Sequence, residues 1–192
     1  GVDLADKKYK KQILRFGKWL YEDAPDGEFE VTPENAKVLV DNFNKKTVEN
    51  VPVTRGHVTQ DEMDKNPDLI AGYVEELEVA DDGVYAVIKT ADDDADEEIA
   101  SKYKNVSASI DSNYQDHETG GMMGWVMRHL ALTTEPYIKA LNPNFIALAD
   151  EYDKKIININ LEEVKTEVVE PIVEPIVEPV VEPVVEKVVE KV

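Results

Sequence analysis

The C-terminal end of the sequence is a proline-punctuated repeat, and this repeat limits where a folded domain can lie. From Val168 onward the chain repeats Val-Val-Glu-Pro or Ile-Val-Glu-Pro, with prolines at 171, 175, 179 and 183. Proline at every fourth position removes a backbone donor from each helical turn and clashes with the preceding turn. We therefore expect an extended, polyproline-like spacer there. The chain divides into a folded domain at 1–150 and an acidic linker or scaffold-connecting tail at 151–192.

Acidic residues dominate both parts of the chain. The formal net charge is -20 at pH 7; residues 150–192 hold 12 acids and five lysines, a net charge of -7, which leaves -13 for the first 149 residues. Such a charge disfavours binding to the nucleic-acid backbone. The chain has no cysteine, which excludes disulfides and thiolate nucleophiles. It has neither a signal-like start nor an apolar run near the roughly 20 residues that span a bilayer, so we expect a cytosolic protein.

Hydrophobic patterns and turn residues predict an α+β domain with a mainly antiparallel, barrel-like sheet and two or more helices. Thr32 and Pro33 are typical of the start of a helix, which we expect to end near residue 45. A second helix is expected from about residue 94, because acids come early and lysines late. Residues 58–69 are interpreted as a surface loop. Strands are predicted at 12–22, 51–53, 70–79, 84–90, 106–114 and 125–133.

Three segments set side chains of catalytic type beside these strands: Pro52–His57, Tyr103–Ser109 and Met127–Pro136. Serine is a poor nucleophile until a base accepts its proton, and the base must be held in one tautomer. Ser107, His57 and His129 are the candidates for nucleophile, base and orienting group.

Each of these residues also has a structural explanation. His57 follows Arg55-Gly56 and fits a turn, and a histidine at the position of His129 is often a hydrogen-bonded core group. Ser107 lies in an alternating strand pattern. Ser109 is its rival, because residues two apart on a strand share a face; periodicity leaves the choice open.

Metal and cofactor sites are not expected. The carboxylates at 92, 94 and 96 resemble the start of a calcium loop, but Glu97 stands where glycine is needed and Tyr103 where the bidentate glutamate is needed. No glycine-rich phosphate loop is present, and no helix-borne spacing supports metal binding by His57 and His129.

The ordered set of segments resembles the protease or protease-scaffold proteins of tailed phages, particularly the Mu-type branch, and more distantly herpesvirus assemblin. The similarity runs from about Ile13 to Ala149. It is carried by Gly17–Trp19, Phe29–Pro33, Asn42–Phe43, Val51–Val53, Ala71–Leu77, Val84–Lys89, Tyr103–Ser107 and His129–Pro136.

This resemblance implies an assemblin-like fold and assigns roles to individual residues. The serine after the Tyr-x-x-Val segment is the nucleophile in such proteins, which implies Ser107, and the histidine after the Pro-Val strand is the base, which implies His57. Assemblins take their third member from a segment similar to His129–Leu132. Asp111 and Glu135 stay open as acidic substitutes for it.

One departure concerns the oxyanion hole. Assemblins follow the second histidine with an Arg-rich, Gly-containing loop, whereas this chain has Thr133–Pro136. Backbone N–H groups and Arg128 are the candidate donors.

By resemblance, then, the chain is a serine endopeptidase that cleaves capsid and scaffold proteins during prohead maturation. It would act in the host cytoplasm, inside the assembling prohead. It would need no cofactor and would bind neither nucleic acid nor a membrane. Self-cleavage and self-association stay open. The alternative is a catalytically inactive capsid scaffold or assembly module.

Overall fold

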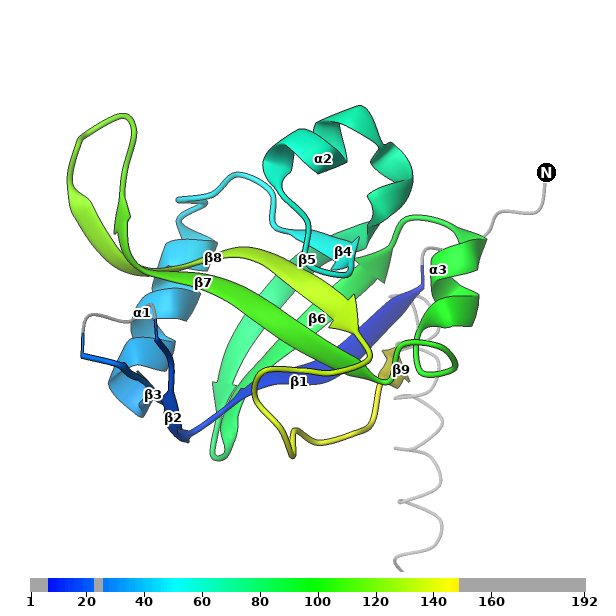
Figure 1. The fold of residues 1–192 in the computed structure, drawn as a ribbon, viewed down its shortest axis with the longest axis horizontal. Helices are drawn as coiled ribbons and strands as arrows, with labels where there is room; N and C mark the ends of the chain where they lie inside the picture. The colour runs from blue at the N-terminus through cyan, green and yellow to red at the C-terminus, as the bar shows by residue number, and fades with distance from the viewer. Residues whose placement is uncertain (1–6, 23–25, 149–192) are drawn as a thin grey trace, which may run out of the picture. The chain divides into compact units, whose positions relative to one another are not determined.

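The computed structural model describes residues 7–22 and 26–148 (Figure 1). The described strands form a seven-stranded sheet in the order β7-β8-β4-β5-β6-β1-β9 and a two-stranded sheet, β2-β3. No helix in these two ranges is long and apolar enough to cross a membrane. The predicted tail, 151–192, lies outside the described residues.

The strands are β1 (Lys8–Arg15), β2 (Gly17–Leu20), β3 (Glu28–Val31), β4 (Pro52–Arg55), β5 (Ile70–Ala80), β6 (Gly83–Thr90), β7 (Asn105–Gln115), β8 (Met122–Thr133) and β9 (Ile146–Leu148). The helices are α1 (Pro33–Asn44), α2 (Gln60–Lys65) and α3 (Asp93–Glu98), with a 3₁₀ turn, η1 (Pro67–Leu69).

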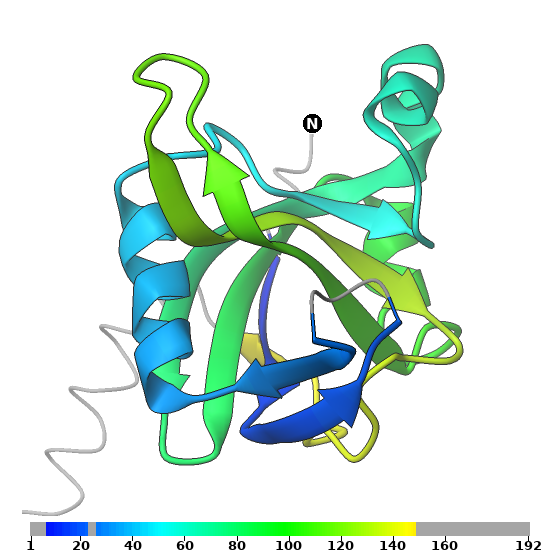
Figure 2. The ribbon, with the colours of Figure 1, turned by 60° about the vertical axis from the view of Figure 1, so that its left-hand side comes forward.

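The described sheet is mainly antiparallel, with β4 and β8 paired in parallel, so the predicted α+β class is confirmed. It curls until the β7–β8 end passes over β1 (Figures 1 and 2). The curl encloses a core to which both ends of the sheet contribute fully buried side chains. Among them are Ile13 and Leu14 of β1, Val106 of β7, and Leu130 and Leu132 of β8.

The prediction of a barrel is wrong in one respect: the described sheet is curled but not closed, with β7 and β9 at its two edges. The outer edge of β1 is already occupied. β9 pairs with Lys8–Lys10. Farther along β1, two side chains bond to the backbone of Asn142: the Lys11 ammonium donates to its carbonyl, and the Gln12 amide oxygen accepts from the N–H of Asn142. β9 and the segment before it thus lie along this edge of β1, and β7 does not pair with it.

Helix α1 confirms the predicted start. Thr32 is the N-cap, its hydroxyl accepts from the N–H of Asn35 at 3.0 Å, and Pro33 opens the first turn. Ala36 and Leu39 are fully buried on the face that packs against β5 and β8 (Figure 2).

The loop predicted at 58–69 is wrong, because α2 and η1 lie within it. Thr59 and Glu62 form a reciprocal capping box: the Thr59 hydroxyl accepts from the N–H of Glu62, and the Glu62 carboxylate accepts from that of Thr59. This spacing is a helix-start signal visible in the sequence. The two locally satisfied donors support a short helix in an otherwise polar segment.

The strand predicted at 12–22 is in fact two strands with different partners. β1 pairs with β6, whereas β2 pairs with β3 in a separate ribbon. The break is at Phe16–Gly17, where Gly17 has φ +153° and the indole of Trp19 lies close above it. The chain thus leaves the main sheet, and residues of β3 line a cavity together with residues of β7.

Candidate active site

His57 is placed by a turn at the end of β4. The N–H of Gly56 donates to the carbonyl of Leu132 on β8 at 2.9 Å, which extends the β4–β8 ladder by one bond. The Thr54 hydroxyl donates to the carbonyl of Gly56 at 2.6 Å. Gly56 has φ +83°, a left-handed conformation that favours glycine. Together these features turn the chain so that the imidazole of His57 lies beside β8.

His129 lies in β8 between β7 and β4. Its Nε2 is 3.1 Å from Nδ1 of His57, and the two rings meet at 64° with centroids 5.3 Å apart. Two histidines separated by 72 positions in the chain are therefore hydrogen-bonded. If His57 donates from Nδ1, its Nε2 keeps a lone pair available to accept a proton.

Both histidines are neutral at pH 7. Desolvation, with smaller contributions from His57 and Arg128, lowers the pKa of His129 from 6.5 to about 4. Desolvation also lowers the pKa of His57 below 6.5, although that residue keeps an exposed surface. The imidazole pair is therefore ready to accept a proton across the neutral range.

The two candidate serines lie on one face of β7. Ser107 is opposite Ala131, Ser109 is opposite His129, and Ser107 is only 6% exposed. Both line a cavity of about 990 Å³ that His57 also lines. Within the described residues neither hydroxyl forms a hydrogen bond with His57. The structure brings the three predicted residues to one region, and the choice between Ser107 and Ser109 stays open.

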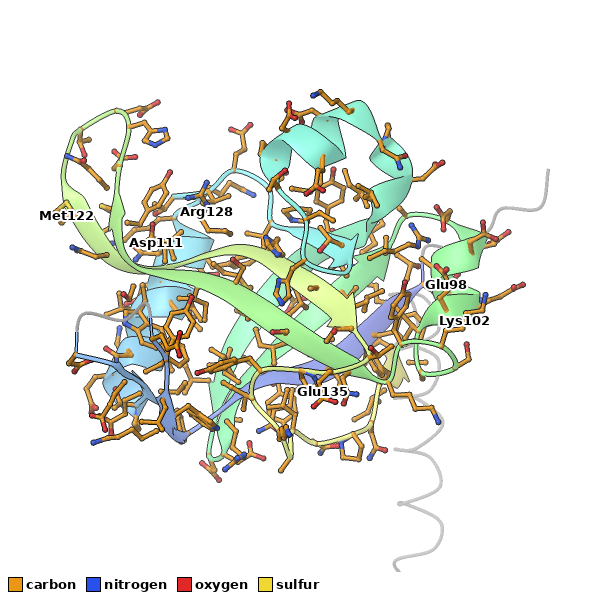
Figure 3. The ribbon with its side chains drawn as sticks, viewed as in Figure 1. Glu98, Lys102, Asp111, Met122, Arg128 and Glu135 are labelled. Carbon is orange, nitrogen blue, oxygen red and sulfur yellow. The ribbon has the colours of Figure 1, made fainter. Side chains whose placement is uncertain are left out.

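The two acidic substitutes are not hydrogen-bonded to His57; Asp111 lines the same cavity, and Glu135 does not. Asp111 accepts a hydrogen bond from the N–H of Asn113, and Glu135 pairs with Lys139 at 3.5 Å. Figure 3 places Asp111 on β7 and Glu135 beyond the end of β8, toward opposite ends of this ribbon. Of the candidates for the third position, His129 is the one hydrogen-bonded to His57.

A family model for the Mu-like prophage I protein, N-terminal domain, matches residues 11–144. The chain belongs to this family. Searches of curated proteins and of solved structures each found no match.

The region matched by the Mu-like prophage I family contains His57, Ser107 and His129. This supports the predicted likeness to a Mu-type phage protein and a phage-related function. The match bears on neither protease activity nor assemblin similarity, so the catalytic roles of the three residues stay predictions.

Arg128 in this Mu-like domain occupies a bulge. Ser109 pairs with His129 and the next residue, Ile110, pairs with Met127, so Arg128 is the extra residue on β8. Bulges re-aim side chains, and Arg128 lines the cavity, with its guanidinium 5.3 Å from the ring centroid of Tyr114. No sequence pattern indicates the bulge itself, although Arg128 is a candidate oxyanion donor by its place in the sequence.

Sequence reasoning missed Arg55. Its side chain is 15% exposed; it pairs with Glu98 at 2.7 Å and donates to the carbonyls of Asp68 and Ile70. Arg55 thus ties α3 and η1 to the strand that carries His57. An arginine two residues before a turn carries no sequence signal for this role.

The structure holds no arrangement of three or more His, Asp or Glu side chains suited to a metal ion within residues 7–22 and 26–148.

Proposed function

We propose that this chain is a serine endopeptidase of phage prohead maturation, which cleaves scaffold and capsid proteins through an acyl-enzyme. The observation that carries the proposal is the His57–His129 hydrogen bond beside a cavity lined by His57, Ser107 and Ser109. The resemblance in the quoted segments supplies the substrate class and favours Ser107 as the nucleophile.

In the proposed reaction the Ser107 hydroxyl attacks the scissile carbonyl, and its proton passes to Nε2 of His57. His129 accepts the Nδ1 hydrogen bond and so holds that tautomer. The tetrahedral intermediate collapses as His57 returns the proton to the leaving amine, which leaves an ester on Ser107. Water, activated by the same imidazole, then hydrolyses the ester and restores the hydroxyl.

The free edge of β7 supports binding of an extended substrate. The carbonyl of Leu132 points toward β4, where it accepts from Gly56. Val106, opposite Leu132, therefore directs its own backbone groups away from β8, as does Ala108 two residues on. Both residues line the cavity, and within the described residues no strand pairs with this edge. A substrate that adds a strand here runs past Ser107.

The second candidate function is a non-catalytic scaffold or assembly module. One observation favours it: Ser107 is nearly buried, and neither serine is hydrogen-bonded to His57. Under the protease proposal, this bond forms when substrate or assembly brings the groups together.

The test is intact mass over time for the wild type beside Ser107→Ala, Ser109→Ala and Ser112→Ala, at high concentration with capsid protein added. Loss of cleavage only in Ser107→Ala supports the proposal, and loss only in Ser109→Ala moves the nucleophile by two residues. Ser112 lines the same cavity and is the matched control. Absence of cleavage in every sample favours the scaffold function.

A further inference from the structure

One wall of the cavity beside β7 is a continuous series of aromatic rings. Trp125 stacks on Phe29 with centroids 5.0 Å apart, Phe29 meets the edge of Tyr21 at 6.4 Å, and Tyr21 meets Tyr137 at 5.5 Å. All four residues line the cavity. Tyr21 and Tyr137 are 42% and 46% exposed, so the outer half of this wall is an apolar surface open to solvent.

The charge along the same cavity is mainly negative. Four acidic residues line it, Asp26, Glu28, Glu30 and Asp111, against one basic residue, Arg128. Glu28 pairs with Lys18 at 3.7 Å. Glu30 and Asp111 have no ion-pair partner within the described residues. A cationic group in the cavity therefore meets two acidic residues, Glu30 and Asp111, that form no ion pair within the described residues.

Two features of β7 indicate that the occupant is a polypeptide. The outward backbone groups of Ala108, a half-buried residue, have no strand partner within the described sheet, whereas those of Val106, which is 1% exposed, are covered. Ser107, 6% exposed, also lines the cavity, and its hydroxyl has no hydrogen-bond partner among the described residues. Backbone donors and acceptors at a strand edge suit an extended chain.

We propose that this cavity selects an extended peptide segment that carries a cationic side chain beside Glu30 and Asp111 and a large apolar side chain against the aromatic wall. The inference rests on the proposed function, for which it names the substrate class. An extended strand alternates its side chains between two faces, so basic and apolar residues in alternation satisfy both surfaces.

The same chemistry disfavours the chain's own C-terminal repeat as the occupant. Its glutamates carry the same charge as the cavity, and its prolines at 171, 175, 179 and 183 have no N–H to donate to β7. The cavity thus discriminates between basic substrates and the adjoining tail of the same polypeptide.

The test measures binding by fluorescence anisotropy to the full chain carrying Ser107→Ala, so that cleavage plays no part. Three labelled peptides of equal length serve as probes: one alternating Lys with Val and Phe, one with Glu in place of each Lys, and one with the Val-Val-Glu-Pro repeat. We expect the Lys peptide to bind about tenfold more tightly than either other peptide at low salt. Equal affinities, tighter binding of an acidic peptide, or no binding of the Lys peptide would overturn the inference.

Matched variants separate the cavity from the general negative charge of the protein. Glu30→Gln with Asp111→Asn is expected to weaken binding of the Lys peptide roughly fivefold, from two partly exposed ion pairs. Glu76→Gln with Asp81→Asn removes the same charge outside the cavity and is expected to leave binding unchanged. Equal effects from the two pairs would contradict the proposal.

The aromatic wall has its own control. Tyr137→Ala is expected to weaken binding of the Lys peptide about threefold or more, whereas Tyr73→Ala, at a 41% exposed site outside the cavity, leaves it unchanged. The two proposals can fail separately. If the Lys peptide binds as expected but the wild-type protein cleaves no substrate, the protease function is refuted and the peptide selectivity of the cavity is supported. If the wild type cleaves substrates without preferring basic ones, the protease function is supported and the selectivity of the cavity is refuted.

Discussion

At the scale of single residues, the site depends on two imidazoles that burial keeps neutral. Nδ1 of His57 and Nε2 of His129 lie 3.1 Å apart, and protonation of both rings would place two cations in contact. Desolvation is the main cause of the lowered pKa of both rings, and the neighbouring His57 and Arg128 lower that of His129 further. The pair therefore links the integrity of the site to pH.

The wild type should lose stability as pH falls through the window from 6.5 to about 4. The pKa of His129 is about 4 in the folded protein and about 6.5 when unfolded, so the unfolded chain binds more protons in this window. After allowance for solvent screening of a partly exposed ring, the loss is about 1–2 kcal/mol. Urea denaturation at pH 7.5 and pH 4.5 measures it.

His129→Asn should reduce this pH-dependent loss, whereas the control His117→Asn, in an exposed turn, should match the wild type. A pH dependence that is the same in all three proteins would contradict the burial of a neutral His129.

Gly56→Ala should disturb the histidine pair. The φ of +83° at this position lowers the stability of any residue with a Cβ by about 1–2 kcal/mol. The cost is conformational, because the Cβ that alanine would add has no atom within 4 Å. We expect the turn to relax and the ¹⁵N shifts of both imidazoles to report loss of their hydrogen bond. Gly120→Ala is the matched control, with φ +73° and equal space; it should cost similar stability without changing those shifts.

At the scale of secondary-structure elements, α1 and β8 are joined by a buried amide. The Asn42 side chain, 4% exposed, donates to the carbonyl of Met123 at 2.8 Å and to that of Trp125 at 2.9 Å. These bonds satisfy carbonyls in the irregular first half of β8. They also hold Trp125, which forms the inner end of the aromatic wall.

Asn42→Ala should lower the free energy of unfolding by about 2–3 kcal/mol, because it leaves buried carbonyls without a donor. Asn44→Ala, at an exposed position of the same helix, should change it by no more than about 0.5 kcal/mol. Chemical denaturation compares the two. Equal effects would show that helix propensity, rather than the two hydrogen bonds, sets the cost.

At the scale of the whole molecule, the fold leaves an open strand edge on a strongly acidic chain. The formal net charge is -20, and the described sheet ends at β7 without a partner. An unpaired edge invites association with other chains, while the negative charge favours cationic ones and repels nucleic acid.

The full chain should therefore not be retained on double-stranded DNA at about 150 mM salt, the ionic strength at which weak phosphate contacts are screened. A DNA-cellulose column, with a basic protein of similar size as the positive control, measures this. Retention at that salt would contradict the expected exclusion of nucleic-acid partners.

The sequence predicted those elements that local chemistry specifies. Thr32 and Pro33 start α1 because capping needs only neighbouring residues. Strand order in the sheet, the break after β1 and the failure of the sheet to close depend on which distant strands pair. Turn and capping signals do not report such pairing.

The sequence by itself determined the candidate residues, the place of the proline-rich acidic repeat, and the α+β class, because each depends on residue type and short spacing. The tertiary structure alone decided that His57 and His129 share a hydrogen bond, since that needs the parallel β4–β8 register. It also brought the aromatic wall to β7. Ser107 and Ser109 share a face by the period-two geometry of a strand, so neither the sequence pattern nor the fold separates them; a nucleophile is identified by its reactivity.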